Sequence, residues 1–205
     1  MNKEEDHPNF RIFKKIAELI REYRESLRIA NAGEIARRYF VMNAFDGALT
    51  VLGIVLGAYI AGVRDINIVV SAVLGASLAM GLSGVWGAYM AEKAERTKKL
   101  KELETALFTN LRNTRLHRAS TAAIIWLALV DGGSPVMVAF AAISPFFLSQ
   151  AGLFPFTLSV YLSILVSLVV LFALGMFLGK ISKENMVLQG FKICLLYTSD
   201  AADDL

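Results

Sequence analysis

Long apolar stretches separated by charged segments dominate the pattern of this chain. Four stretches contain no Lys or Arg and carry only two acidic residues between them, Asp46 and Asp131. They cover residues 39–63, 67–91, 119–148 and 154–179. A helix needs about 20 apolar residues to cross the hydrocarbon core of a bilayer, so each stretch is long enough. The pattern predicts an all-α, polytopic membrane helix bundle with four transmembrane helices, at residues 39–62, 67–91, 119–148 and 156–179.

The segment before the first apolar stretch has a different pattern. Its apolar residues recur every three or four positions, with Lys and Glu between them, at Phe13, Ile16, Ile20, Tyr23 and Leu27. This spacing is typical of an amphipathic helix. We expect residues 1–38 to form an amphipathic N-terminal helix on the cytoplasmic side. There it either lies on the membrane surface, with its basic residues toward lipid headgroups, or packs on neighbouring helices.

The placement of charge predicts the topology. Only 19% of the residues are charged, whereas a soluble domain carries about a quarter. Nine Lys and Arg lie in residues 1–38 and eight in residues 92–118, whereas Arg64 alone separates the first two apolar stretches. Because basic loops stay in the cytoplasm, we expect the N-terminus and the helical loop 92–118 to lie there, in a multi-pass protein of the cell membrane. Topology thus accounts for the net charge of +3, and no nucleic-acid partner is expected.

The last twelve residues, 194–205, have the sequence expected of a translated sequencing adapter. We therefore expect them to be an artefact and the transmembrane domain to cover residues 39–193. A fifth transmembrane helix is then expected to be missing beyond Ile193. The single cysteine, Cys194, falls within this tail, so the sequence predicts no thiol chemistry.

Asp46 is the only acidic residue of the first apolar stretch. Asn43 lies three residues before it and Thr50 four residues after it, on one helix face. An acid inside a membrane helix is costly unless it is paired, protonated or hydrated. We interpret these three residues as the lining of a hydrated path or of a close helix contact, with Asp46 as a candidate functional residue. The alternative is a structural Asp that caps or pairs with a neighbouring helix.

Asp131 opens the sequence Asp-Gly-Gly-Ser-Pro, which ends at Pro135 in the third apolar stretch. The glycines and the proline predict a kink or a break in this helix. A break would free backbone carbonyls, which either bind a cation or are satisfied by Asp131 and Ser134. The Asp131-Gly pair repeats the Asp46-Gly pair 85 residues earlier, which indicates a weak internal repeat unless the similarity is chance.

Small residues and then glutamates follow one side of the second apolar stretch. Ser77, Gly81, Gly84 and Ala88 form the small stripe, which permits close helix packing. The helix is expected to continue into the cytoplasm, where the stripe leads to Glu92, Glu95 and Glu102. Carboxylates bind hard or borderline divalent cations, so these three are candidate metal ligands. The alternative is a solvated helix with Glu–Lys pairs, such as Glu95 with Lys99.

Met80 lies within the same stretch and offers a soft thioether, although a lone Met in an apolar helix more often packs. Four segments together resemble the vacuolar iron transporter family in a short prokaryotic form. They are residues 37–50 (RRYFVMNAFDGALT), 75–84 (GASLAMGLSG), 91–95 (AEKAE) and 129–135 (LVDGGSP). The resemblance implies a homodimer of five-helix subunits that exchanges protons for Fe²⁺ or Mn²⁺. It also implies an ion path along the first helix that uses Asp46 and Met80.

The expected function is proton-coupled antiport of divalent metal ions, with no enzyme activity and no cofactor. The expected partners are the lipid bilayer, divalent metal ions and a second copy of the chain. One alternative is a non-transporting membrane scaffold. Another is a lipid-headgroup phosphotransferase, which also uses Asp-Gly in a membrane helix. Its motif continues with Ala-Arg and further Asp residues, whereas Asp46-Gly is followed by no acid before Asp65.

Overall fold

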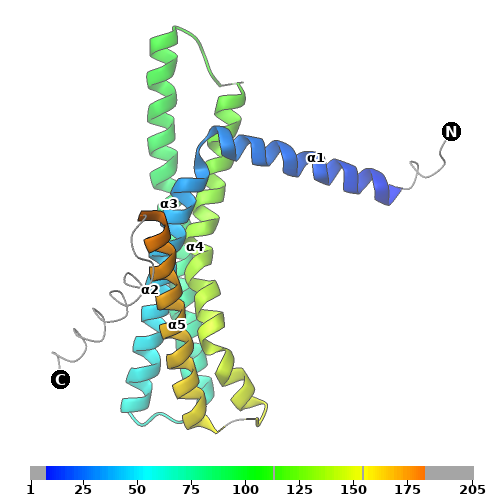
Figure 1. Cartoon of the computed structure of the whole chain (residues 1–205). Helices are drawn as coiled ribbons and strands as arrows, with labels where there is room; N and C mark the ends of the chain where they lie inside the picture. The colour runs from blue at the N-terminus through cyan, green and yellow to red at the C-terminus, as the bar shows by residue number, and fades with distance from the viewer. Residues whose placement is uncertain (1–7, 113, 154, 183–205) are drawn as a thin grey trace. The chain divides into compact units, whose positions relative to one another are not determined.

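The structure is a computed structural model that describes residues 8–112, 114–153 and 155–182 (Figure 1). Within these residues the chain is all-α, as predicted. It forms five helices, α1 (Pro8–Ile29), α2 (Ala32–Ile60), α3 (Ile66–Leu107), α4 (Arg115–Gln150) and α5 (Phe156–Ser182). The expected adapter tail and fifth transmembrane helix lie outside the described residues.

Four of the described helices, α2 to α5, are long and apolar enough to cross a membrane. This confirms the four predicted spans. Helix α3 has 42 residues, which at about 1.5 Å per residue is roughly twice the thickness of a bilayer core. It continues without interruption from the apolar stretch through the charged segment, because residues 91–107 contain no Gly or Pro to stop it.

The chain divides into two compact units. One consists of residues 1–37 and 87–129, and the other of residues 38–86 and 130–205. We call them the charged unit and the apolar unit, after the residues that they contain. Helices α2, α3 and α4 contribute to both, and each unit is described below by itself.

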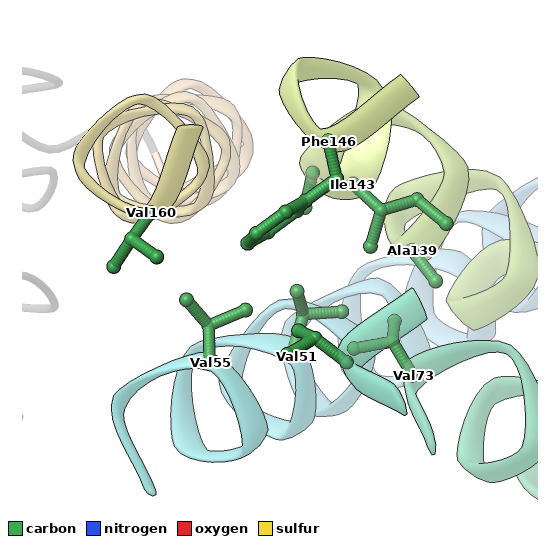
Figure 2. Close-up of a cluster of buried hydrophobic side chains, with 9 residues drawn as sticks. Val51, Val55, Val73, Ala139, Ile143, Phe146 and Val160 are labelled. Carbon is green, nitrogen blue, oxygen red and sulfur yellow. The ribbon is translucent and has the colours of Figure 1, made fainter. Parts of the chain in front are cut away.

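Two clusters of buried apolar side chains pack α2 to α5 of the apolar unit together. In the first, Val51 and Val55 of α2 point toward Phe146 of α4, with Val73 of α3 and Val160 of α5 beside them (Figure 2). The second cluster joins α2, α4 and α5 and consists of Val41, Ala44, Ala48, Val138, Leu171 and Leu174. Lipid tails are as apolar as these side chains, so close packing rather than the hydrophobic effect holds such helices together.

Glycines bring two helices against α4 in the apolar unit. A Cβ added at Gly47 of α2 would lie 2.7 Å from the Cα of Pro135, and one at Gly81 of α3 would lie 2.8 Å from the oxygen of Gly132. Neither position therefore has room for a larger residue. The close packing predicted from the small stripe is confirmed at Gly81 and also at Gly84. A Cβ added at Gly84 would lie 3.2 Å from the Cα of Gly132.

Residues 131–135 were expected to kink or break the helix, and the break is wrong, because α4 is one helix from Arg115 to Gln150 with two prolines inside it. Pro135 has no N–H to bond the carbonyl of Asp131, four residues earlier. The hydroxyl of Ser134 donates to that carbonyl instead, at 2.9 Å. Ser144, which precedes Pro145, likewise donates to the carbonyl of Ala141 at 2.8 Å. In each Ser-Pro pair, the serine satisfies a carbonyl that the proline leaves unbonded, so the helix continues.

Candidate functional site

Asp131 is a buried acid of the apolar unit, with 6% of its surface exposed. The amide Nδ2 of Asn43, on α2, donates a hydrogen bond to its Oδ1. Its other oxygen faces α3, because a Cβ added at Gly84 would lie 3.0 Å from Oδ2. The carboxyl group therefore lies where α2 and α3 both approach α4. A buried acid in a membrane span needs such a partner, and the absence of a side chain at Gly84 leaves room for it.

A second polar contact lies farther along α2. The hydroxyl of Thr50 donates to the thioether sulfur of Met80, on α3, at 3.5 Å. Thr50 follows Asn43 by seven residues, close to two helical turns, so the two contacts occupy one side of α2 about 10 Å apart. The structure thus brings together four of the predicted site residues in two pairs, Asn43 with Asp131 and Thr50 with Met80. Carboxylate, amide, hydroxyl and thioether groups are all possible ligands of a divalent cation.

Asp46 faces a different way. It lies between Asn43 and Thr50 in the sequence, but its side chain is exposed, whereas theirs are half-buried. Gly53 and Gly57 share its side of α2, and a Cβ added at either would meet no described atom within 4 Å. The predicted polar stripe of α2 is therefore divided between an inward part and an outward part.

The glutamates predicted as ligands belong to the charged unit. Glu92 is buried, unlike a residue of the solvated helix considered as the alternative, and it pairs with Arg96, the Nε of which lies 2.9 Å from its Oε2. Glu95 is exposed and pairs with Lys99 at 3.1 Å, which confirms the Glu–Lys pair considered from the sequence. Glu102 is exposed. Among the described residues, no three His, Cys, Asp or Glu side chains gather into a metal site.

Two features of the structure were not predicted from the sequence. Arg96 reaches beyond Glu92 to the carbonyl of Ala30, at 3.5 Å, and this contact was missed because the partners are 66 residues apart. In α5, Ser159, Ser163 and Ser167 recur every four residues and are fully buried. The hydroxyls of Ser159 and Ser163 have no hydrogen-bond partner among the described residues. Their regular spacing was the signal that could have revealed this buried serine stripe.

Comparison with known proteins gives one relationship that decides the family. No family model and no solved structure matches the chain. It is 34% identical over 164 residues to the uncharacterized protein MJ0645 of Methanocaldococcus jannaschii, over 78% of this chain and 82% of that protein. The chain belongs to the MJ0645 family. Because MJ0645 is itself uncharacterized, membership in the MJ0645 family assigns no activity. With its four long apolar helices, this member of the MJ0645 family is an integral, multi-pass membrane protein.

Proposed function

We propose that the chain is a transporter of divalent metal ions, with Fe²⁺ or Mn²⁺ as its cargo and protons as the coupling ion. The observation that carries this proposal is the buried Asp131, bonded to Asn43 within the membrane-spanning helices. Acids in this position are costly and typically belong to ion or proton pathways. The resemblance of the Asp46 and Met80 segments to vacuolar iron transporters supports the same function.

The donor groups favour a transition metal over Mg²⁺ or Ca²⁺. Asn43, Thr50 and Asp131 supply oxygen, and Met80 supplies sulfur within reach of Thr50. Oxygen ligands alone suit Mg²⁺ and Ca²⁺, whereas a thioether adds affinity for softer ions. Each of the two pairs of side chains offers a metal ion only a few ligands. The metal ion therefore binds transiently, as transported cargo.

Proton coupling follows from the chemistry of the two acids. A carboxylate must lose its proton to bind a metal ion, so a metal ion and a proton compete at Asp46 and at Asp131. A conformational change that moves the acid between the two sides of the membrane would then exchange one for the other. This chemistry is transport rather than catalysis, and we propose no enzyme activity.

We further propose that the transporter is a homodimer. Asp46 is exposed within a span of α2, beside the open surfaces of Gly53 and Gly57. A carboxylate that faces lipid is unfavourable, and small residues allow two helices to approach closely. A second copy on this side of α2 would shield Asp46 from lipid and place two Asp46 side chains near one path.

We propose a smaller role in transport for the glutamates of the charged unit. With the N-terminus and residues 92–118 in the cytoplasm of the cell, Glu95 and Glu102 would raise the concentration of cations at one end of the path. Glu92 contributes less, because Arg96 neutralises it. Each exposed glutamate is hydrated and replaceable by its neighbour.

Metal flux in proteoliposomes tests this function. Purified protein is reconstituted, a pH gradient is imposed, and uptake of Fe²⁺, Mn²⁺, Zn²⁺ and Mg²⁺ is compared with empty vesicles. We expect Fe²⁺ or Mn²⁺ to be taken up fastest and to dissipate the pH gradient. Protein that inserts and remains monodisperse but moves none of these ions would favour the membrane scaffold instead.

A further inference from the structure

A polar cavity of about 370 Å³ lies in the charged unit, between α1 and the first turn of α4. This volume falls within the range of about 300–1,000 Å³ that is usual for small-ligand sites. Six charged side chains line it: Glu18, Arg21, Glu22, Glu25, Arg115 and Arg118. Three are acidic and three are basic, so the cavity presents both signs of charge and no net charge.

The acidic and basic side chains that line the cavity do not pair with one another. Within the described part of the chain, no ion pair within 4 Å joins any two of the six. They are spaced around the cavity and exposed to solvent. A ligand that carries both an anionic and a cationic group would therefore find partners for both.

One hydrogen bond joins the two helices that line the cavity. The hydroxyl of Tyr23, on α1, donates to the carbonyl of Ala122, on α4, at 3.1 Å. Burial raises the pKa of the Tyr23 phenol, which keeps it protonated as the donor. Since Tyr23 lies between Arg21 and Glu25 in the sequence, its bond sets the position of that part of α1 beside α4.

The cavity lies beside the start of a candidate membrane span. Helix α4 is one of the four described helices that are long and apolar enough to cross a membrane. Its charged first turn, with Arg115 and Arg118, precedes the apolar run that begins at Ala119. The two arginines thus border the end of the apolar run, which is the part of a membrane helix that meets lipid phosphates when the run spans the bilayer. On α1, Ile20 is an exposed apolar residue, as expected for a helix in contact with the membrane surface, and Ile29 adds an apolar side chain to the cavity lining.

We propose that this cavity binds the headgroup of a zwitterionic phospholipid that carries a phosphate and a primary ammonium group, as phosphatidylethanolamine does. Arg21, Arg115 and Arg118 bind the phosphate, since guanidinium groups donate paired hydrogen bonds to phosphate oxygens. Glu18, Glu22 and Glu25 accept hydrogen bonds from the ammonium group. A choline headgroup has no N–H to donate, and a purely anionic headgroup leaves the glutamates facing negative charge. This site does not depend on the transport proposed above.

Lipid binding to the full-length protein in detergent tests the site. Short-chain phosphatidylethanolamine, phosphatidylglycerol and phosphatidylcholine are titrated by calorimetry, together with soluble phosphoethanolamine. We expect phosphatidylethanolamine to bind at least about tenfold more tightly than the other two lipids, as the loss of charge-assisted hydrogen bonds predicts. Equal binding of phosphatidylcholine would overturn the site. Equally tight binding of phosphoethanolamine would show a soluble ligand rather than a lipid.

Two variants with opposite effects separate the site from a folding defect. Arg115→Gln with Arg118→Gln should weaken binding of phosphatidylethanolamine at least about tenfold. Glu22→Gln should instead tighten binding of phosphatidylglycerol, because it removes a negative charge that faces the anionic headgroup, and misfolding does not produce such a gain. The control, Lys98→Gln with Lys101→Gln, removes two exposed charges of α3 away from the cavity and should leave binding unchanged. Unaltered binding in both test variants would contradict the proposal.

Discussion

The two Asp-Gly pairs of the apolar unit have the same sequence but opposite environments. Both glycines lie at close helix contacts, Gly47 against Pro135 and Gly132 against Gly81. Asp131 is buried, whereas Asp46 is exposed. Adjacent residues of a helix point about 100° apart, so an Asp beside a packed glycine is buried only if another helix covers the adjoining side. Helix α4 has α2 and α3 on two sides at this level, and α2 has no such neighbour beside Asp46.

The difference separates two properties of the pair. The glycine determines how closely two helices pack. The Asp determines whether the side of the helix next to that contact carries a group that can be charged. Asp131 is buried and accepts a hydrogen bond from Asn43, so its replacement should affect stability. Asp46 makes no described hydrogen bond, so its replacement should affect function without affecting the fold.

The largest effect is expected from Asp46→Asn. This change keeps the shape of the side chain but removes its charge and its proton, so proton-coupled metal flux should fall by about 100-fold or more while the protein still inserts and elutes as wild type. Flux in proteoliposomes under a pH gradient, with size-exclusion chromatography, measures both. Wild-type flux in Asp46→Asn would contradict the coupling role of this acid.

Gly132→Ala should give a clear loss of stability. Its Cβ would collide with the carbonyl oxygen of Gly81 and with Val85, so α3 and α4 must move apart, at a cost of about 1–3 kcal/mol. Gly133→Ala is the matched control, because its Cβ would meet no described atom within 4 Å. Thermal unfolding in detergent should be clearly lowered for the first and nearly unchanged for the second. Equal unfolding temperatures would disprove the tight α3–α4 contact.

Asn43→Ala tests the partner of the buried acid. Removing the amide leaves Asp131 without its donor from α2, which should cost about 1–3 kcal/mol of stability. Met42→Ala removes an exposed neighbouring side chain and should cost at most about 0.5 kcal/mol. The same unfolding measurement compares them. A similar cost for both variants would mean that the hydrogen bond to Asp131 adds nothing.

The smallest effect is expected from Glu95→Gln. The pair of Glu95 with Lys99 is exposed, and exposed pairs contribute about 0–1 kcal/mol, so stability should stay the same. The apparent affinity for the metal should weaken by about twofold, because one of several surface carboxylates is lost. The concentration dependence of flux measures this change, and a complete loss of transport would show a direct ligand instead.

Much of the fold could be predicted because it depends on local properties. The length and composition of each apolar stretch specify a span whatever its neighbours are, and the Glu95–Lys99 pair follows from helical spacing. Which acid is buried could not be predicted, because periodicity gives the direction of Asp46 and Asp131 on their own helices but not which side the neighbouring helices cover.

The wrong expectations have the same origin. The expected break at Pro135 did not allow for the Ser134 hydroxyl as a replacement donor within the helix. The solvated-helix alternative counted Glu92 among the hydrated glutamates, because the sequence does not show that the neighbourhood of Arg96 is buried. In both cases one hydrogen bond, invisible in the hydrophobic pattern, changed the outcome.

The Ser-Pro pairs of α4 also have an evolutionary consequence. Replacing Ser134 alone uncovers a backbone carbonyl at a buried position, whereas replacing Pro135 alone restores a backbone donor and makes the hydroxyl redundant. The order in which the two residues can be replaced during evolution is therefore constrained. The proline can be replaced first, and the serine can be replaced only after the proline. Among relatives of this chain, we expect Pro without Ser to be rare at these two positions and Ser without Pro to be tolerated.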